Sequence, residues 1–396
     1  MAAPYTEGDA RCTPAAATDV GPIGVRGVIA LRIACAPHDA GRTRLPAFLN
    51  AIGSAVPDHD IHDAFVDWAK ARIDPASGKL FARMAARSGI DHRWSILPRG
   101  DAGGSPVGPG GFYADAMPGT AARMSLYAAA APDLGIAAID ALKTKVALGA
   151  VTHIVVASCT GFVAPGIDQI IARRIGLSPS VERLLIGFMG CYAAVAALRS
   201  ARHIVRSDPG ARVLVLAVEL STLHLQDASA IEPLLAMLQF ADGAAAALVT
   251  DDPVGFELER GFAAALPDSA ELIRWDITDS GFAMHLGGEV PARIAAALAD
   301  EAFADIATGG AAPASIDWAV HAGGRSILDA VQKALDLPDD ALDASRQVLR
   351  ECGNMSSATL LFVLEKLLAR GPVERGVALA FGPGLAAEGV TFRSPR

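Results

Sequence analysis

The sequence contains the same strand–helix–strand arrangement twice. In the first half the segments are VTHIVVAS (151–158), MGCYAAVAAL (189–198) and ARVLVLAVE (211–219). In the second half they are IDWAVHAGGRSI (316–327), CGNMSSATLLFVL (352–364) and RGVALAFGPG (375–384). Because strands that alternate with helices are typical of α/β folds, the repeat predicts an α/β protein built from two similar halves.

The two copies place different reactive residues at matching positions. Cys191, which follows a glycine, occupies the position of Asn354, which also follows a glycine. The region of Cys159 in the first half matches the region of His321 in the second. Two related halves would therefore bring Cys191, His321 and Asn354 to one pseudo-symmetric centre.

The composition agrees with a large buried core. The chain has 396 residues, of which 52% are hydrophobic and 19% are charged, so it has room for two domains or for one large fold built from two halves. The formal net charge of −9 argues against a protein that binds nucleic acid or an anionic membrane.

We expect no membrane span, because by our reading no apolar stretch approaches 18 to 20 residues, and the polar N-terminus is unlike a signal peptide. No pair of cysteines forms a CxxC motif, and the cysteines are too scattered for a disulfide framework or a zinc site. A reducing cytoplasm is the simplest location, and we expect no bound metal. The five cysteines are Cys12, Cys35, Cys159, Cys191 and Cys352.

The chain order predicts a tail and two halves. We expect a flexible tail over 1–24, a first half with the nucleophilic cysteine over 25–245, and a second half with the histidine and asparagine over 246–396. Helical periodicity is expected in 61–73, 80–90 and about 119–148, and the glycine-rich segment 100–112 is expected to be a loop. The segment 25–37, VRGVIALRIACAP, is expected to be the first buried strand.

Cys191 is a candidate nucleophile. A cysteine between a strand and a helix points its sulfur at the helix N-terminus, whose partial positive charge stabilises a thiolate. A nearby histidine would lower the pKa of the thiol further through an imidazolium–thiolate pair. The alternative is that Cys191 is a small buried hydrophobic residue.

His321 and Asn354 are candidate hydrogen-bond donors. Two neutral N–H groups could hold a thioester carbonyl as it becomes an enolate, as a decarboxylating enzyme that forms carbon–carbon bonds requires. The alternatives are a buried core histidine and an asparagine that caps a helix.

Four segments resemble the type III polyketide synthases, the chalcone/stilbene synthase family, and its bacterial branch in particular. These are GFMGCYAA, WAVHAGGRSILDAVQKAL, ECGNMSSATLLFVLE and AFGPGL, and the resemblance extends from about Val25 to Phe392. It implies the thiolase fold, with two duplicated αβαβα halves in a five-layered sandwich, and a homodimer. It also implies acyl-CoA and malonyl-CoA as substrates, with no metal, flavin or nicotinamide cofactor.

The same resemblance assigns roles to individual residues. Cys191 matches the nucleophile, and His321 and Asn354 match the catalytic histidine and asparagine. Phe240 matches one of two gatekeeping phenylalanines, and Met284 stands in place of the other, which predicts a softer gate. For Phe240 and Met284, ordinary core packing is the alternative.

Further positions of the resemblance lie in the substrate pocket. Cys159 stands where plant members have threonine, Trp275 where they have glycine, and Ala164 where they have the methionine that crosses the dimer. We expect a pocket that is closed near Trp275 and opened near Ala164, with Cys159 either a second reactive thiol or a small wall residue. The remaining pocket positions are Ser221, His224 and Ser356.

Cations for the phosphates of coenzyme A are expected in KLFARMAARSGIDHRW. Arg83 and Arg87 match the phosphate-contacting positions, and their spacing of four places them on one helix face. Leu80 replaces a third cation, for which Lys79 is a possible substitute. A solvated helix face is the alternative.

The starter and the product are less constrained. The bacterial branch commonly extends fatty acyl-CoA, and a pocket narrowed by Trp275 favours lactonisation to an alkylpyrone. Alkylresorcinols and malonyl-primed products, phloroglucinol or tetrahydroxynaphthalene, are alternatives. Two other classes remain: a priming ketoacyl carrier-protein synthase, and a non-catalytic scaffold that binds acyl-CoA.

Overall fold

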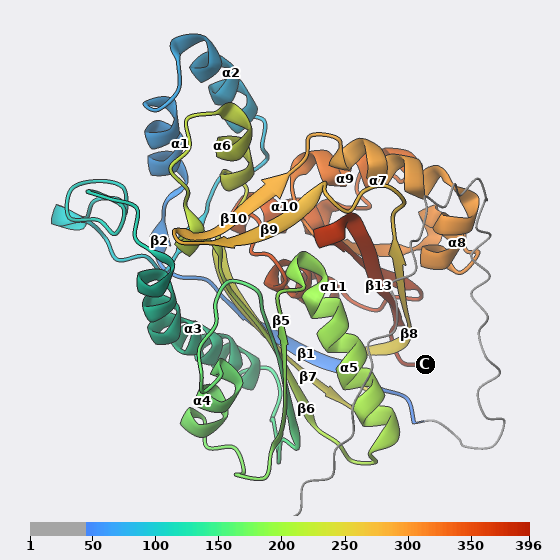
Figure 1. Ribbon diagram of the computed structural model, residues 1–396. Helices are drawn as coiled ribbons and strands as arrows, with labels where there is room; N and C mark the ends of the chain where they lie inside the picture. Colours follow the sequence, from blue (N-terminus) through green and yellow to red (C-terminus); the bar gives the residue numbers. More distant parts are fainter. Residues whose placement is uncertain (1–44) are drawn as a thin grey trace, which may run out of the picture. The chain divides into compact units, whose positions relative to one another are not determined.

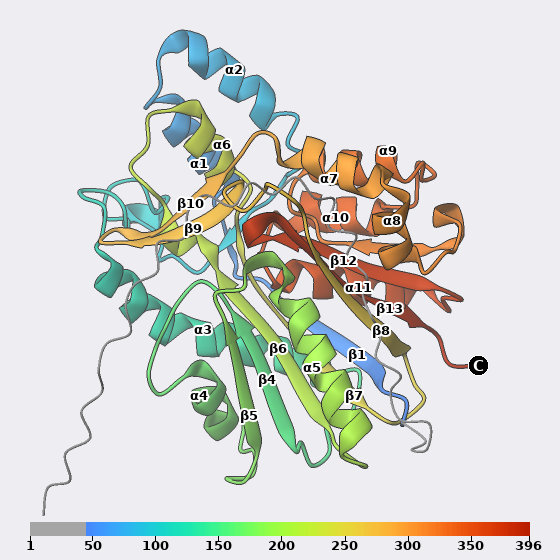
Figure 2. The same cartoon turned by 45° about the vertical axis from the view of Figure 1, so that its right-hand side comes forward.

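A nine-stranded sheet runs through the protein in the order β11-β12-β13-β8-β1-β7-β6-β4-β5 (Figures 1 and 2). The computed structural model describes residues 45–396, so the expected tail and the expected strand over 25–37 lie outside the described residues. The strands of the sheet are β1 (Phe48–Ala55), β4 (His153–Ser158), β5 (Glu182–Gly187), β6 (Val213–Leu220), β7 (Asp242–Thr250), β8 (Phe256–Ala265), β11 (Asp317–Val320), β12 (Gly376–Gly382) and β13 (Ala386–Arg393).

The strand order shows the duplication that the sequence repeat predicts. In one half-sheet the order is β1-β7-β6-β4, and in the other it is β8-β13-β12-β11. The pairs β4–β6 and β11–β12 are parallel, whereas β6–β7, β12–β13, β1–β7 and β8–β13 are antiparallel. The two halves join edge to edge, where Phe48 pairs with Glu257 and Leu49 with Phe256.

Helices fill the layers on both sides of the two half-sheets. Helices α5 (Ala193–Ser207) and α11 (Ala358–Arg370) contact strands of both halves, and their apolar residues share one core with both. The outer helices of the first half are α3 (Thr120–Lys143) and α4 (Ile167–Arg174). Those of the second half are α7 (Val290–Ala299), α8 (Glu301–Thr308), α9 (Arg325–Ala334) and α10 (Asp343–Cys352). This is the predicted five-layered, thiolase-like α/β fold.

A helical cap stands over one end of the sheet. It consists of α1 (His62–Lys70), α2 (Pro75–Ala85) and α6 (Ile231–Met237), which lie together at the top of Figures 1 and 2. The three helices share a small core, which includes Phe65, Phe81 and Leu234. The hairpin of β9 (Ile273–Thr278) and β10 (Gly281–Leu286) lies below this cap, with β10 in contact with α6. A short ladder of β2 (His59–Asp60) and β3 (Trp94–Ser95) completes the described strands.

The local predictions for this part of the chain are confirmed for α1, α3 and the loop, whereas the helix expected over 80–90 is α2, which spans Pro75–Ala85 and so lies five residues earlier. Helices α1, α2 and α3 lie within or close to the segments with helical periodicity, and 100–112 is a loop with one short helical turn, Asp101–Gly103. Helix α2 begins where the Asp74 side chain accepts hydrogen bonds from the backbone N–H groups of Ala76 and Ser77.

The expectation of no apolar stretch of membrane-spanning length was wrong for α3. Among the helices of residues 45–396, this 24-residue helix alone is long and apolar enough to cross a membrane. It contacts β1, β6 and β7 and buries residues such as Tyr127, Leu134 and Leu142. A helix that packs on a protein core passes the same test of length and composition, and 44% of the apolar window of α3 is buried inside the structure.

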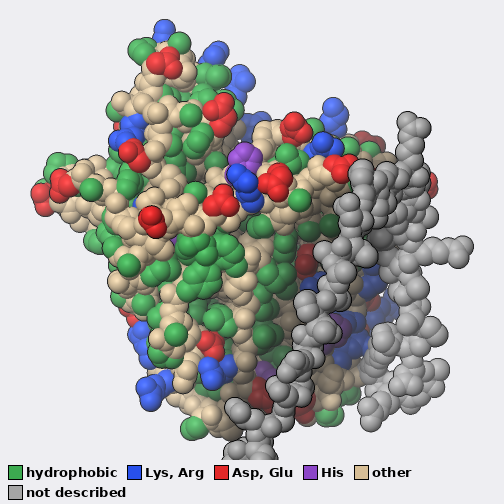
Figure 3. Space-filling view, in the orientation of Figure 1, with side chains coloured by type: hydrophobic (Ala, Val, Ile, Leu, Met, Phe, Trp, Pro, Cys, Tyr) green, Lys and Arg blue, Asp and Glu red, His purple; other side chains and the backbone are tan. Residues whose placement is uncertain are grey.

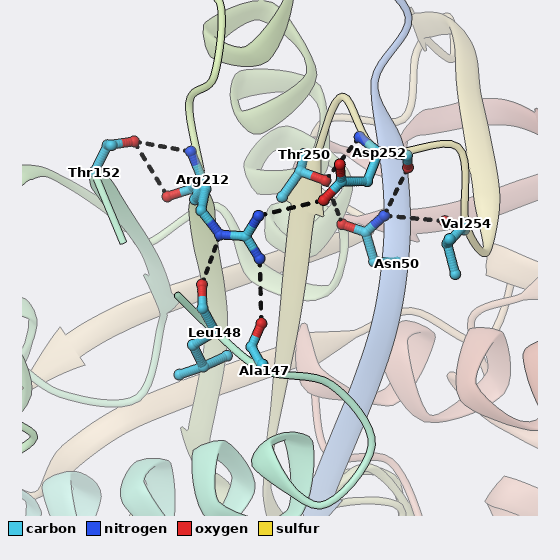
Figure 4. A network of polar contacts seen from close by, with 8 residues as sticks. All are labelled: Asn50, Ala147, Leu148, Thr152, Arg212, Thr250, Asp252 and Val254. Atoms are coloured by element: carbon cyan, nitrogen blue, oxygen red, sulfur yellow. Dashed lines mark hydrogen bonds and ion pairs between the residues drawn. The ribbon is translucent and has the colours of Figure 1, made fainter. Parts of the chain in front are cut away.

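Hydrogen bonds fix the turn that carries the chain from the first half-sheet into the second (Figure 4). The Arg212 guanidinium donates to the carbonyls of Ala147 and Leu148, and its Nη1 lies 3.3 Å from Oδ2 of Asp252. Asn50 Nδ2 donates to the carbonyls of Asp252 and Val254, both at 3.0 Å. Strand β7 continues to Thr250, past residue 245, where we expected the first half to end.

Candidate active site

Cys191 lies between a strand and a helix, as the sequence predicts. Strand β5 ends at Gly187, a short helical turn spans Gly190–Tyr192, and α5 follows directly. Gly190 has φ +75°, and a Cβ at this position would lie 2.4 Å from Cδ of Pro383. Only glycine therefore fits before the cysteine.

Asn354 follows a glycine in the same conformation, since Gly353 has φ +69°. Its Oδ1 accepts a hydrogen bond from the N–H of Ser356 (2.9 Å), and its Nδ2 donates to the carbonyl of Gly323 (3.2 Å). Helix α11 begins at Ala358, after an N-cap at Ser357. Asn354 is therefore not the cap of this helix, and its side chain is held in one orientation at the turn.

His321 follows the last residue of β11, and its backbone N–H donates to the carbonyl of Leu379 (2.8 Å). Its side chain is buried, and neither ring nitrogen has a hydrogen-bond partner within residues 45–396. Burial lowers the pKa of His321 to about 3, so the imidazole is neutral.

The three side chains line one cavity, which we call the catalytic cavity. It holds about 540 Å³ of empty space, and Cys191 comes from the first half whereas His321 and Asn354 come from the second. Other lining residues include Phe240, Ile273, Trp275, Met284, Leu286, Phe381 and Pro383. The chain repeat thus places the three reactive residues together, although they lie up to 163 positions apart in the sequence (191 to 354).

The expected imidazolium–thiolate pair is not the state of this site. Burial raises the pKa of Cys191 to about 12, and the carboxyl of Glu219 acts in the same direction. The side chains of Ser356 and Asn354 lower this pKa, but by less than burial raises it. Desolvation outweighs the helix N-terminus, so both Cys191 and His321 are neutral.

A larger cavity lies beside the catalytic cavity, under the helical cap. This outer cavity holds about 860 Å³ of empty space, and its wall is mostly apolar. Phe240, Met284 and Trp275 line both cavities, so they form the wall between the two. Ser221 and His224 line the outer cavity but not the catalytic cavity. The two expected gatekeeping positions therefore lie at a boundary rather than inside one core.

His224 is a fixed part of the outer cavity wall. Its Nε2 lies 2.8 Å from the carbonyl oxygen of Thr160, and the N–H of Phe282 donates to its Nδ1 (3.1 Å). The imidazole is stacked on the Phe282 ring, with centroids 4.1 Å apart. Burial lowers the pKa of His224 to about 4, which agrees with a neutral ring that donates through Nε2.

Cys159 lies in a third, rear cavity, whose wall it shares with Trp275 and Pro383. The Sγ of Cys159 accepts a hydrogen bond from the N–H of Gly190 at 2.9 Å, and burial raises its pKa well above the ordinary value. The thiol thus supports the turn that carries Cys191. This contact favours a wall residue over a second nucleophile.

Two expected pocket residues do not line the three cavities. Ala164 is exposed. Ser356 is buried beside Asn354, and its hydroxyl has no hydrogen-bond partner among the described residues. The sequence pattern does not distinguish a residue that lines the cavity from one that is buried behind the cavity wall.

The expected CoA-binding cations are on the cap. Lys79 and Arg83 lie on α2, and Arg87 lies in the turn after this helix ends at Ala85. All three side chains are exposed, and none makes an ion pair within residues 45–396. The expectation that Arg83 and Arg87 share one helix face was wrong, because the helix ends two residues before Arg87.

Arg93 is a site residue that the sequence analysis missed. It is 2% exposed and lines the outer cavity. Its Nη1 donates to the carbonyls of Met237 (3.0 Å) and Phe240 (2.9 Å), and its guanidinium lies 4.5 Å from the centroid of the Phe65 ring. No local pattern marks this arginine, because its partners are about 150 residues away in the chain.

The described residues contain no cluster of three or more His, Cys, Asp or Glu side chains that could hold a metal ion. Glu219 is a fully buried acid whose charge raises the pKa of Cys191. Its carboxyl accepts hydrogen bonds from the N–H of Cys159, the hydroxyl of Thr160 and the hydroxyl of Ser357. Burial raises its pKa to about 7.

Solved structures of similar fold cover most of the chain. The C-terminal type III polyketide synthase domain of Steely1, a type I/III hybrid from Dictyostelium, is 24% identical with a TM-score of 0.80, and the match covers 89% of this chain and 100% of that domain. PKS-I from the brown alga Ectocarpus siliculosus is 26% identical with a TM-score of 0.79, and the match covers 89% of this chain and 100% of that one. A point mutant of CsyB is 22% identical with a TM-score of 0.77, over 88% of this chain and 100% of that one.

Two family profiles match almost the whole described chain. The profile described as "Chalcone and stilbene synthases, N-terminal domain" matches residues 36–253. The profile described as "Chalcone and stilbene synthases, C-terminal domain" matches residues 257–395. Together with the duplicated fold and the shared cavity, these matches show that the chain belongs to the chalcone and stilbene synthase family and is a condensing acyltransferase of the type III polyketide synthase class.

Proposed function

We propose that this protein transfers a fatty acyl starter from coenzyme A to Cys191, extends it with malonyl-CoA and cyclises the chain to an alkylpyrone. The observation that carries the proposal is the pair of buried, unpartnered ring nitrogens of His321 in a cavity shared with Cys191 and Asn354. A buried polar group without a partner costs about 1–3 kcal/mol. A thioester oxygen from the substrate would remove that cost.

The loading step is a thioester exchange. The Cys191 sulfur attacks the carbonyl carbon of the starter, its proton passes to the neutral His321, and the sulfur of coenzyme A leaves and takes that proton. One thioester replaces another, so little free energy is lost. Asn354 and His321 are the N–H donors for the oxyanion that forms during the attack.

The extension step uses the same two donors. The carboxylate of malonyl-CoA leaves as carbon dioxide, and the electron pair of the broken bond becomes the enolate of the acetyl thioester. His321 and Asn354 stabilise the enolate oxygen, and its carbon attacks the thioester on Cys191. A carbon–carbon bond forms and the Cys191 thiolate leaves, ready to be reloaded.

The cavities support an apolar starter. The outer cavity is mostly apolar and shares Phe240, Met284 and Trp275 with the catalytic cavity. We propose that a fatty acyl chain attached at Cys191 extends past these three side chains into the outer cavity. The indole of Trp275 also limits the space in which an extended chain can fold back. This restriction favours closure through oxygen to a pyrone over aldol closure to a ring of carbon atoms.

The exposed cations of α2 and of the turn after it support coenzyme A as the carrier. Lys79, Arg83 and Arg87 make no ion pairs in the described chain, and a phosphate group would give them a partner. We propose that they bind the phosphates of coenzyme A, and that the reaction uses no metal, flavin or nicotinamide cofactor.

We further propose that the enzyme is cytoplasmic and belongs to the bacterial branch of the family. We also propose that it forms a homodimer through β5. Strand β5 lies at an edge of the sheet, and Leu184 and Leu185 on it are 43% and 46% exposed. Phe162, nearby at the start of the loop after β4, is 49% exposed. Hydrophobic side chains also gather below the β9–β10 hairpin on the face drawn in Figure 3. Exposed apolar edge strands commonly pair with another chain.

The test is a product assay with the purified protein. [14C]Malonyl-CoA is incubated with starters from acetyl-CoA to stearoyl-CoA and one aromatic CoA ester, and products are identified by mass spectrometry, with Cys191→Ala as the control. Pyrones that require a long-chain starter and disappear in the control would support the proposal. Alkylresorcinols would support only the starter class. Products from malonyl-CoA alone would indicate phloroglucinol- or naphthalene-type chemistry, and no product with any CoA ester would indicate a synthase that depends on carrier protein.

A further inference from the structure

Two residues on the wall of the apolar outer cavity each carry a buried polar atom that has no hydrogen-bond partner within residues 45–396. These are Nη2 of Arg93 and Oγ of Ser221, and both residues line this cavity. Arg93 is 2% exposed and Ser221 is 9% exposed, so solvent at the protein surface does not solvate either group.

The other nitrogens of Arg93 are fully used by the protein. Nη1 donates to the carbonyls of Met237 and Phe240, and Nε donates to Nδ1 of His62 (3.3 Å). The Asp60 carboxylate accepts from the backbone N–H of Arg93 rather than from the guanidinium. Within residues 45–396 no carboxylate makes an ion pair with this guanidinium. Its Nη2 is therefore the one nitrogen that remains able to donate to a bound molecule.

The unpaired donor of Arg93 favours an occupant of the outer cavity that can accept a hydrogen bond. A buried charged group is retained when its donors are paired, and an unpaired donor of such a group is costly. A saturated hydrocarbon chain in the outer cavity would leave Nη2 unpaired. A chain that carries an oxygen atom at the right depth would pair with it.

We propose that the outer cavity binds an acyl starter that carries an oxygen acceptor away from its thioester, with Arg93 and Ser221 as the groups that recognise this oxygen. The inference rests on the proposed function, in which the starter extends from Cys191 past Phe240, Met284 and Trp275 into this cavity. The oxygen belongs to a hydroxyl, a keto group or a carboxylate, since each accepts a hydrogen bond from a guanidinium.

The test compares starters of equal length on the unaltered enzyme. Dodecanoyl-CoA, a mid-chain hydroxydodecanoyl-CoA, ω-hydroxydodecanoyl-CoA and the CoA monoester of dodecanedioic acid are each assayed for kcat/KM of product formation with malonyl-CoA. We expect at least one oxygenated starter to exceed dodecanoyl-CoA by about tenfold, which corresponds to one additional buried hydrogen bond. Equal or better use of dodecanoyl-CoA would overturn the inference while leaving the proposed function in place. If no long-chain starter gives product, the proposed function itself fails.

Variants then locate the recognition. Arg93→Lys and Ser221→Ala should each lower the ratio of kcat/KM for the preferred oxygenated starter over dodecanoyl-CoA by at least about threefold. Because the ratio is taken within one variant, a general loss of activity cancels. Arg123→Lys is the matched control: Arg123 is also buried with an unpartnered Nη2, but it does not line the outer cavity. An unchanged ratio in Arg93→Lys and Ser221→Ala, or an equal fall in Arg123→Lys, would contradict the assignment.

Discussion

Phe240 and Asn354 pair through their backbones, although they are distant in the sequence. The N–H of Asn354 donates to the carbonyl of Gln239 (2.8 Å), and the carbonyl of Asn354 accepts from the N–H of Ala241 (2.9 Å). Arg93 in turn donates to the carbonyl of Phe240. The wall between the two cavities is therefore tied directly to one of the proposed catalytic donors.

Arg93→Ala should destabilise the protein by about 3 kcal/mol, because the carbonyls of Met237 and Phe240 lose their donor and a void forms next to Phe65. Urea unfolding measures the change. The control is Arg99→Ala: Arg99 is exposed and donates to the carbonyl of Asp58, so its removal should cost less than about 0.5 kcal/mol. Equal losses in the two variants would contradict the positioning role of Arg93.

Gly190→Ala should lower the free energy of unfolding by more than the strain of placing an alanine at a positive φ accounts for. Its Cβ would lie 2.4 Å from Pro383 and displace the turn that carries Cys191, so both stability and product formation should fall. Gly210→Ala is the matched control, because Gly210 has φ +78° with no atom near the added Cβ. The control should lose about 1–2 kcal/mol and keep its activity. If the two variants unfold at the same urea concentration, the contact with Pro383 is unimportant.

Alkylation of Cys191 by iodoacetamide should keep accelerating well above pH 9. The pKa of the thiol is raised to about 12 by burial, so its thiolate fraction grows about tenfold per pH unit up to that range. An unburied cysteine reaches its plateau near its ordinary pKa of about 8.5. The rate is followed by mass spectrometry of the labelled peptide, with Cys191→Ser to identify labelling of other cysteines. A plateau near pH 7 would show that an ion pair with His321 exists after all.

Acid should destabilise the protein through His321. Its pKa is lowered to about 3 in the folded state, so below the ordinary value of 6.5 the unfolded chain binds a proton that the folded protein does not. Stability is then lost as pH falls from 6.5 toward 3, by about 1.4 kcal/mol per pH unit. Glu219 and Asp242, whose pKa values burial raises to about 7 and about 6, contribute the opposite dependence.

His321→Gln isolates this contribution, because the carboxyl groups are the same in both proteins. Between pH 6.5 and pH 5 the unaltered protein should lose about 2 kcal/mol more than His321→Gln, as measured by urea unfolding at each pH. Parallel curves of stability against pH would mean that His321 is solvated in the folded protein.

Trp275→Gly should change the ratio of products. The indole lines the catalytic, outer and rear cavities, so its removal should enlarge and join the spaces around it. With more room to fold back, the extended chain should give more alkylresorcinol and less alkylpyrone, as measured by mass spectrometry with one fatty acyl-CoA. Ile277→Gly is the control: Ile277 lies on the same strand, is 58% exposed and lines none of these cavities. An unchanged ratio in Trp275→Gly would refute the proposed role of the indole.

The sequence by itself determined the repeat, the main helices and strands, and the candidates Cys191, His321 and Asn354. These depend on periodicity, on small residues at turns, and on glycines whose conformation no other residue adopts easily, all of which are local properties. The family resemblance followed from the same local motifs. The sequence also predicted that Cys191 and Asn354 lie at one pseudo-symmetric centre, because they occupy matching positions in two copies of the same unit.

Only the tertiary structure decided the state and surroundings of those residues. The helix N-terminus predicts a thiolate at Cys191, but desolvation by the surrounding segments outweighs it, and the sequence does not show which segments surround the thiol. The same holds for Arg93, whose carbonyl partners on α6 and in the following turn have no sequence relation to it. The wall formed by Phe240, Met284 and Trp275 likewise exists only because the hairpin, the cap and the turn at Asn354 meet there.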